Sequence, residues 1–509
     1  MKRVRRMGQS GFGTDGQERL FFRFVKRALY LPVILCILTA ASGCGFSGTW
    51  AGEDRRTAET GKEMEAGQDA GSGWESESGQ NAGSGQELEA GQDAGSGWEL
   101  ASGQDAGSSP KMESVQAPEL PARFDLRERM ELFPIPDQQD TGTCWAFAAL
   151  AAVESSMPEE LRIPLSADHM IFHNGFGFGM DGGDSSMAAA YLLSWQGPVA
   201  QEEDPFGDGN SPEGLEPVCH VQEIRILPEK DYEAIKQAVY TTGGVESSVY
   251  IPQEFREGDE KALCYKGEEE ANHEVVIVGW DDEYPRENFS VSPDEDGAFL
   301  CRNSWGGQFG DEGYFYVSYE DCRIGTDAVS YSGIQPADRL TRIYQTDRCG
   351  WTGQMGFGTS DAWFSNRYEA GENVWIEAAG FYAVMPETSY QVYVTGDLSG
   401  ERKLAAEGIL EDAGFYTVPF SEAISVRSGE SFFVAVSISS PGAVEPVAVE
   451  YAGDSTRLAG IDIQDGEGYI SADGKSWQRT EESGANVCLK AYGAVRTEKD
   501  GVQTQDEGE

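Results

Sequence analysis

The last third of the chain alternates apolar and polar residues in short runs separated by turn residues. The runs follow Gly333, and Gly, Pro, Asp or Ser stands between them: WIEAAGFYAV, SYQVYVTGD, AGFYTVPF, ESFFVAVSISS and PVAVEYAG. A period of two places one face of a strand in a core and the other in solvent. Short alternating strands with frequent turn residues predict an all-β sandwich over residues 335–495.

Residues 119–334 carry helical and strand patterns together. Ala146–Ser155 is rich in Ala and Leu and ends before Met157-Pro158, which predicts a buried helix with Thr143 as its N-cap. The apolar runs Val275–Val278 and Phe299–Arg302 predict short strands.

The N-terminal pattern is that of an export signal. Residues 1–27 are basic and residues 28–41 are apolar, a run too short to span a bilayer comfortably, so a cleaved signal peptide over residues 1–43 is expected. Ala41-Ser42-Gly43-Cys44 resembles a bacterial lipobox, which implies a lipid anchor on Cys44 and retention at the outer face of the membrane. Ordinary cleavage nearby, with Cys44 unmodified, is the alternative.

Residues 44–118 have the composition of a spacer. Gly, Ser, Gln, Asp and Glu dominate, and a 12-residue repeat starts at Gly67, Gly79, Gly91 and Gly103. The repeats have no apolar face to stack, so we expect a disordered acidic tether. Residues 496–509 are expected to form a disordered tail.

The charge of the chain excludes nucleic acid as a partner. Its 38 Lys+Arg against 87 Asp+Glu give a net charge of −49 at pH 7, which repels nucleic acid and anionic lipid. The sequence has no CxxC spacing and no His cluster, so we expect neither a metal nor another cofactor.

Candidate chemistry begins at Cys144 in DQQDTGTCWAFAALAAVES. The predicted helix carries this thiol in its first turn, where the helix dipole stabilises a thiolate, and a nearby imidazolium would stabilise it further. A lone cysteine at such a place is more often a structural residue that packs like alanine. The rest of the sequence has to supply its partners.

Two further segments supply them, NHEVVIVGWDD around His273 and FLCRNSWGGQFGDEGYFYVSY around Asn303. With Cys144 they closely resemble the papain-like cysteine peptidases over about residues 120–333. LPARFDLRE is similar to the start of the mature family domain, and LSADHMIF is similar to the segment after the catalytic helix. The resemblance implies an α+β papain-like two-lobed catalytic domain, followed here by the sandwich.

The resemblance also implies the site. Cys144 would be the nucleophile, His273 the acid and base, Asn303 the group that orients the imidazole, and Gln138 an oxyanion donor, while Trp305 would shield the His–Asn bond. Taken alone, His273 is more simply a core residue of a strand, and Gln138 a solvated loop residue beside Gln139.

The DGG segment resembles the substrate-binding glycine loop of the family, which would make Gly182 and Gly183 contacts of an extended substrate backbone. A plain turn is the competing interpretation.

The sequence departs from the family at one disulfide, because Thr141 and Met180 stand where its cysteines would be. It also has no helical, hydrophobic propeptide of the usual kind before Leu120.

Beyond Cys144 and the signal region, six cysteines are expected to pair by proximity in the sequence as Cys219 with Cys264, Cys301 with Cys322, and Cys349 with Cys488.

From about Arg342 to Val495 the chain resembles the lectin-like domain of certain bacterial surface cysteine peptidases, on YQTDRCGWTGQMGFG and AWFSNRYEAGENVWIEAAGFYAV. A glycan or cell-wall polymer is therefore a candidate partner of residues 335–495. Trp351, Trp363 and Trp375 would stack on sugars, or would instead belong to the core.

The sequence thus predicts an exported, lipid-anchored cysteine endopeptidase acting on proteins or peptides. The alternatives are a catalytically silent surface adhesion protein that keeps the peptidase fold, and an acyltransferase of the transglutaminase type. The last ranks lowest, because that chemistry ordinarily uses a carboxylate where Asn303 stands.

Overall fold

The computed structural model describes residues 118–177, 179–258, 261–453, 456–458, 460–463 and 467–495. The expected signal peptide with Cys44, the spacer and the tail at 496–509 lie outside the described residues. No helix in the described ranges is long and apolar enough to cross a bilayer.

The first half of the described chain forms a helical side and a sheet side around one core. The helices are α3 (Cys144–Ser156), α4 (Ala167–His173), α5 (Ser185–Leu193), α6 (Tyr232–Thr241) and α7 (Gln253–Glu257). The strands are β1 (Arg123–Asp125), β2 (Cys219–His220), β3 (Glu223–Ile226), β4 (Val245–Val249), β5 (Ala262–Leu263), β6 (His273–Asp281), β7 (Ala298–Arg302), β8 (Tyr314–Ser318), β9 (Val329–Ser332) and β10 (Gln335–Pro336). Short 3₁₀ turns lie at Leu126–Glu128, Glu159–Leu161 and Arg286–Asn288.

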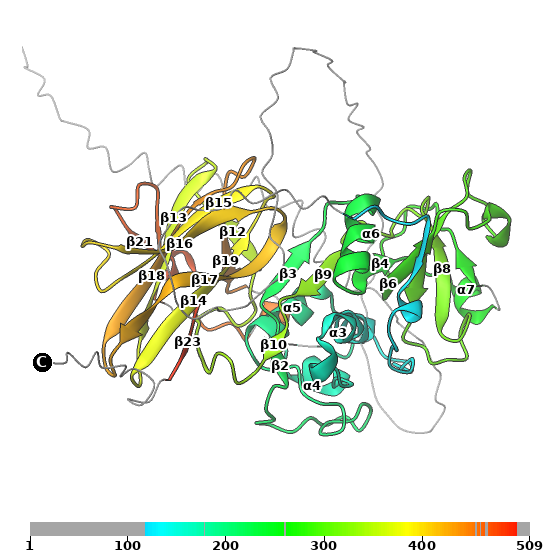
Figure 1. The fold of residues 1–509 in the computed structure, drawn as a ribbon, viewed down its shortest axis with the longest axis horizontal. Coiled ribbons are helices and arrows are strands. Elements are labelled where there is room, and N and C mark those ends of the chain that lie inside the picture. Colours follow the sequence, from blue (N-terminus) through cyan, green and yellow to red (C-terminus); the bar gives the residue numbers. More distant parts are fainter. Residues whose placement is uncertain are drawn as a thin grey trace, which may run out of the picture. The chain divides into compact units, whose positions relative to one another are not determined.

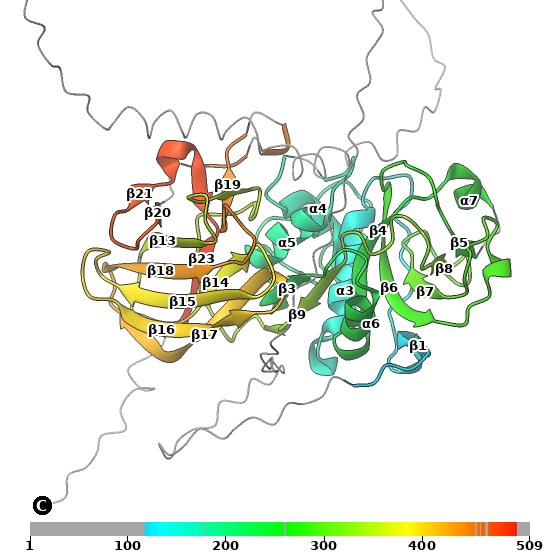
Figure 2. The ribbon, with the colours of Figure 1, turned by 90° about the horizontal axis from the view of Figure 1, so that it is seen from above.

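The second half is the predicted sandwich. Its strands are β11 (Arg342–Tyr344), β12 (Gly353–Met355), β13 (Asp361–Glu369), β14 (Val374–Ala383), β15 (Thr388–Thr395), β16 (Lys403–Leu410), β17 (Ala413–Val426), β18 (Ser431–Ser439), β19 (Val447–Tyr451), β20 (Gly468–Ser471), β21 (Gln478–Arg479), β22 (Ala485–Val487) and β23 (Leu489–Ala494). The 3₁₀ turns here are Thr456–Leu458 and Glu481–Ser483. A six-stranded sheet in the order β16-β15-β18-β13-β20-β21 forms one layer (Figure 2). Phe364, Phe381 and Val434 belong to the core that it shares with β14 and β23.

One sheet runs through both halves of the described chain. Its order is β11-β23-β14-β17-β3-β9-β4-β6-β7-β8-β5, with β1 paired to β6. The join is the antiparallel pairing of β17 with β3, from Ala413↔Ile226 to Tyr416↔Glu223. Beside it, Arg225 Nε donates to Asp412 Oδ2 at 2.8 Å. The sandwich therefore continues the sheet of the first half.

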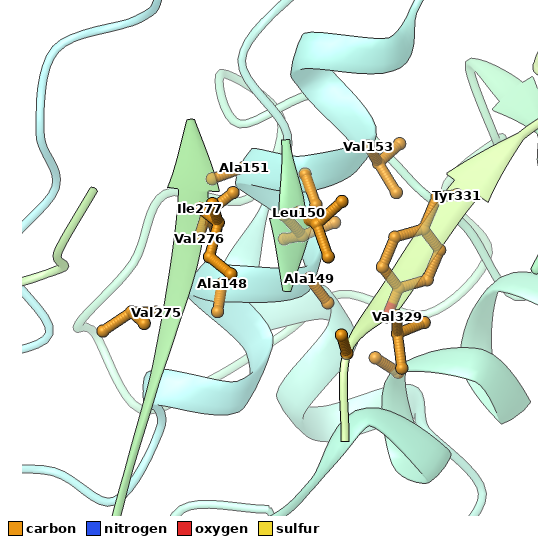
Figure 3. Packing of buried hydrophobic residues seen from close by; sticks show 14 of the residues in the cluster. Ala148, Ala149, Leu150, Ala151, Val153, Val275, Val276, Ile277, Val329 and Tyr331 are labelled. Carbon is orange, nitrogen blue, oxygen red and sulfur yellow. The ribbon is translucent and has the colours of Figure 1, made fainter. Parts of the chain in front are cut away.

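Helix α3 lies in the middle of the first core (Figure 1). Every residue from Trp145 to Ser155 is buried. Val276 and Ile277 of β6, and Val329 and Tyr331 of β9, belong to the same apolar cluster (Figure 3). A helix that is apolar all round is stable only when protein surrounds it, so its position is fixed from several sides at once.

Glu154 is the charged exception within this helix. It is 8% exposed, and its Oε1 accepts a hydrogen bond from the backbone N–H of Leu165 at 2.9 Å. Burial raises the pKa of Glu154 to about 7, against the opposing effects of Arg302 and of the Leu165 bond. The folded state therefore holds a proton that the unfolded chain releases at lower pH.

We predict that Glu154→Gln removes a loss of stability that develops as the pH rises. When a carboxyl group has a higher pKa in the folded than in the unfolded state, its protonation adds to the free energy of unfolding. This contribution is complete below about pH 4.5 and is lost as the pH rises past about 7. The free energy of unfolding of Glu154→Gln, measured relative to that of the unsubstituted protein, should therefore be about 3 kcal/mol higher at pH 8 than at pH 4.

Thermal unfolding of both proteins at the two pH values measures this difference. Glu160→Gln, at an exposed position in the next turn, is the matched control and should show no such change. If the Tm of Glu154→Gln differed from that of the unsubstituted protein by the same amount at both pH values, the account would be contradicted.

Candidate active site

Cys144 is the first residue of helix α3, at the end of the helix where the backbone N–H groups have no partner within the helix. Its side chain is partly exposed. Thr143 occupies the N-cap position as predicted, but it makes no side-chain capping bond. Its hydroxyl lies 2.7 Å from the Thr141 hydroxyl instead, so Thr143 tightens the preceding loop and leaves the helix end uncapped by side chains.

His273 and Asn303 meet in the sheet side of the fold. His273 is the first residue of β6, and Asn303 directly follows β7, the neighbouring strand. Their side chains are 4% and 3% exposed, and His273 Nε2 lies 2.7 Å from Asn303 Oδ1. Because Nε2 is used in this contact, Nδ1 is the remaining ring nitrogen for proton exchange.

Trp305 lies over this pair. Its ring centroid is 4.5 Å from that of His273, and the guanidinium of Arg256 lies 5.2 Å from the indole centroid. The backbone holds Trp305 through an isolated bridge to Asp137. The indole thus packs against the imidazole of the His273–Asn303 pair, and shielding of their hydrogen bond from water stays a prediction.

Burial lowers the pKa of His273 to about 4; the Asn303 hydrogen bond opposes this shift, and Arg256 adds to it. A lone imidazolium is thus unfavourable at this position. A charged His273 requires an adjacent anion, and a thiolate at Cys144 is the group that the helix N-terminus would stabilise.

Gln138 is 2% exposed and is not a solvated loop residue. Its Oε1 accepts from the Ser304 hydroxyl at 2.7 Å, its Nε2 donates to the Thr141 carbonyl at 2.8 Å, and its backbone N–H donates to the Ser304 carbonyl at 2.8 Å. One N–H of the amide remains for another acceptor. The side chain is thus held in a single orientation before any substrate arrives.

Ser304 links the two halves of the site, and the sequence analysis missed it. Its hydroxyl holds Gln138, and its backbone N–H donates to Asn303 Oδ1 at 2.8 Å. Its position between Asn303 and Trp305 in the sequence was the feature that could have marked Ser304 as a site residue.

Gly182 and Gly183 are both required by the fold. Gly182 has φ +133°, a region that favours glycine. A Cβ on Gly183 would lie 2.5 Å from Trp145 Nε1. A conformational reason therefore exists for Gly182 and a packing reason for Gly183, and substrate contact remains a prediction for both.

A backbone bond joins the two segments in which the family disulfide is replaced. Gly142 N–H donates to the Met180 carbonyl at 2.9 Å. A Cβ on Gly142 would lie 2.7 Å from Gly182 N, so the two loops are in direct contact without a covalent link.

The predicted disulfides are wrong. Among the described residues, the structure has free thiols at all of these positions: Cys219, Cys264, Cys301, Cys322, Cys349 and Cys488. Proximity in the sequence failed because the thiols lie on separate elements with other partners. Cys322 Sγ donates to the Gly267 carbonyl and Cys349 Sγ to the Gly175 carbonyl.

The described residues contain no group of three or more His, Cys, Asp or Glu side chains arranged to hold a metal ion.

The candidate sugar-stacking tryptophans are all partly buried. Trp363 stacks on Tyr393 at 5.5 Å and has Arg402 5.2 Å from its centroid, while Trp351 packs beside Tyr382 at 5.6 Å. Trp375 lies within β14. Trp351 and Trp363 therefore pack against neighbouring rings while each keeps part of its surface in solvent.

Two family models cover most of the described chain. Residues 120–332 match the papain family cysteine protease and residues 343–493 match the lectin like domain. A viral cathepsin of Cydia pomonella granulosis virus is 25% identical over 215 residues, covering 40% of this chain and 60% of the relative. A cathepsin L-like peptidase of Aedes aegypti is 26% identical over 212 residues, covering 38% of this chain and 58% of the relative. This chain thus matches less than two thirds of the length of these relatives.

A solved structure has both parts in the same order. It contains the cysteine protease and lectin-like domains of Cwp84, a surface layer associated protein of Clostridium difficile. The TM-score is 0.66 at 22% identity, over 76% of this chain and 91% of that structure. The fold is therefore a papain-like catalytic domain followed by a lectin-like β-rich domain, as the sequence predicted.

We predict that Ser304→Ala lowers kcat for a fluorogenic peptide about tenfold with little change in KM, less than the roughly 10²- to 10³-fold that follows loss of an oxyanion donor itself. The reason is that Gln138 loses the hydroxyl that fixes its amide. Ser292→Ala, at an exposed loop position, is the control. An unchanged kcat for Ser304→Ala would show that Gln138 does not need this contact.

Proposed function

We propose that this chain, whose residues 120–332 are a papain-family cysteine protease domain, hydrolyses peptide bonds through Cys144, His273 and Asn303. The observation that supports the proposal best is the buried contact of 2.7 Å between His273 Nε2 and Asn303 Oδ1 beneath Trp305. It orients an imidazole whose other nitrogen is left to serve a thiol. Burial makes that imidazole a poor cation without a thiolate partner, so the two groups would ionise together.

In the proposed reaction, the Cys144 thiolate attacks the peptide carbonyl carbon. The oxyanion accepts hydrogen bonds from the remaining amide N–H of Gln138 and from the backbone N–H of Cys144. His273 gives its Nδ1 proton to the departing amine, which leaves a thioester on Cys144. Neutral His273 then takes a proton from water, and the resulting attack releases the acid product and restores the thiolate.

The surroundings of the site are part of the same proposal. Gly182 and Gly183 would pair with the backbone of an extended substrate, and Asn303 would keep the imidazole in one orientation through the cycle. Substrates are proteins or peptides in this account. The proposed domain limits are residues 119–334 for the peptidase and residues 335–495 for the sandwich.

We further propose that the protein works outside the cell, anchored by lipid on Cys44 after removal of residues 1–43 and held away from the membrane by residues 44–118. The apolar run before Cys44 and the acidic repeats after it support this. A glycan or cell-wall polymer bound by residues 335–495 would bring the peptidase to proteins of the cell surface.

We predict a single covalent adduct when the protein, under reducing conditions, meets an epoxysuccinyl thiol probe. Intact mass should show one adduct on the unsubstituted protein and none on Cys144→Ala or His273→Ala, because only a thiolate made by the pair reacts quickly. Unchanged Tm values of the two variants would exclude unfolding as the cause.

The other outcomes separate the competing functions. An adduct on His273→Ala at the original rate would remove His273 from the mechanism. No adduct on any of the three folded proteins would favour a catalytically silent surface protein that binds through its lectin-like domain.

A further inference from the structure

Residues 175–184, which we term the loop segment, carry the two glycines of the proposed substrate contact. From the peptidase side, Gly142 N–H donates to the Met180 carbonyl at 2.9 Å, and the Trp145 indole N–H donates to the Gly179 carbonyl at 3.1 Å. These bonds fix the middle of the loop segment against α3 and against the loop that precedes it. Its two ends are held from the lectin-like domain.

Arg457 of the lectin-like domain holds the loop segment at two points. Its backbone carbonyl accepts from Gly177 N–H at 3.1 Å, and its Nη2 lies 2.8 Å from Asp184 Oδ2 and 2.9 Å from Asp184 Oδ1. Gly182 and Gly183 stand between these two attachment points in the sequence. The path of the backbone through both glycines is therefore tied to the position of Arg457.

The Arg457 guanidinium is enclosed by its partners. The side chain is 11% exposed, and that of Asp184 is 19% exposed. The same Nη2 donates to Ser186 Oγ at 3.0 Å, and the guanidinium carbon lies over the Phe176 ring, 5.0 Å from its centroid. Water and salt screen such an enclosed charge pair only weakly, and a planar guanidinium can stack on a ring while it binds a carboxylate.

Asp184 connects this ion pair to helix α5. It is the N-cap of the helix, and its Oδ1 accepts from the Ser186 backbone N–H at 3.0 Å. It also directly follows Gly183, which lies so close to the Trp145 indole that a Cβ would not fit. The carboxylate is thus held by the helix on one side and by Arg457 on the other, which fixes the end of the loop segment.

A second contact from the lectin-like domain lies at the start of the loop segment. Cys349 Sγ donates to the Gly175 carbonyl at 3.3 Å, and a Cβ on Gly460 would lie 3.4 Å from the same carbonyl oxygen. Both residues lie within the range that matches the lectin like family. Two separate parts of that domain therefore contact the loop segment.

These contacts matter because the loop segment lacks a covalent restraint. Thr141 and Met180 stand where the family has the two cysteines of a disulfide, so a backbone hydrogen bond of Gly142 takes its place. A hydrogen bond restricts a loop less than a covalent link does, since it can open and close. The ion pair of Arg457 supplies a further restraint from outside the peptidase domain.

We propose that Arg457 is a positioning residue of the peptidase. Its ion pair with Asp184 holds the backbone of Gly182 and Gly183 in the conformation that pairs with an extended peptide. The inference rests on the proposed function, since it concerns the substrate contacts of the same site. A loop that is ordered in advance loses less conformational freedom when the peptide binds, so the peptide binds more tightly.

Two thiol reagents of different size separate positioning from catalysis. An epoxysuccinyl dipeptide presents a peptide backbone to the loop segment, whereas iodoacetamide is too small to need it. In Arg457→Met, which keeps an apolar stem and removes the guanidinium, the rate constant for the epoxysuccinyl dipeptide should fall at least about fivefold. The rate constant for alkylation of Cys144 by iodoacetamide should stay within about twofold, because α3, β6 and β7 still hold the thiol and the imidazole.

Peptide cleavage gives a second measurement of the same effect. For a fluorogenic peptide that extends several residues before the scissile bond, KM should rise at least about fivefold in Arg457→Met while kcat stays unchanged. The reason is that backbone pairing with the loop segment stabilises the bound substrate and the transition state alike. Active sites are counted by intact mass after exhaustive labelling, so that misfolded protein does not enter kcat.

Asp184→Asn tests the ion pair from the other side, and does so alone if Arg457→Met does not fold. Asparagine is as good an N-cap as aspartate, so α5 keeps its cap while the ion pair is lost. This variant should reproduce the slower reaction with the dipeptide, and the double variant should be no slower than either single one. Arg479→Met, at an exposed arginine of the lectin-like domain that pairs with Glu481, is the matched control and should leave both rates unchanged.

The results distinguish this inference from the proposed function. Unchanged reaction with the dipeptide, an equal fall with both reagents, or additive losses in the double variant would overturn Arg457 as a positioning residue and leave the proposed peptidase intact. Failure of the unsubstituted protein to cleave any peptide, together with failure to form the epoxysuccinyl adduct, would overturn the proposed function itself.

Discussion

The burial of helix α3 is the constraint on which the site depends. Its residues from Trp145 to Ser155 are enclosed by the sheet and by α5, so Cys144 at its first position has little freedom to move. The neighbouring loops are then fixed against this helix. Gly183 packs on the Trp145 indole, and Gly142 touches the loop of Gly182, which brings the predicted substrate contacts to the thiol without a disulfide.

The same burial sets the chemistry of the ionisable groups. In water an imidazole at its ordinary pKa needs no partner to be charged, but His273 does, because desolvation disfavours its cation. Glu154 and Glu246 show the matching effect on acids, since burial raises the pKa of each. Because burial disfavours the charged form, each of these groups becomes charged only when a neighbour of opposite charge stabilises it. A thiol and an imidazole that exchange one proton meet this condition, since they become charged together.

Much of the fold was predictable because it follows from local patterns. The Ala-rich run gave the buried helix, and alternation after Gly333 gave the sandwich. The pairing of β3 with β17 was not predictable, because no local pattern marks two strands nearly 200 residues apart as neighbours. The disulfide prediction failed for a related reason, since proximity in the sequence does not measure distance between elements.

The site divides in the same way. The segments around Cys144, His273 and Asn303 suggested the candidate residues, whereas the contacts that hold them required the structure. Ser304 is an example, because its role follows from a hydrogen bond between its hydroxyl and Gln138, which lies on a separate loop.

The central claim is that His273 makes Cys144 a thiolate. The rate of alkylation of each cysteine by iodoacetamide as a function of pH, followed by peptide mass mapping, tests it most directly. We predict that Cys144 is alkylated rapidly several pH units below the ordinary thiol pKa of about 8.5. In His273→Ala, rapid alkylation of Cys144 should begin only near that ordinary pKa. Cys322, partly exposed and with its pKa raised by burial, serves as the reference thiol in the same sample. A Cys144 profile that matches Cys322 and is unaffected by His273→Ala would contradict the account.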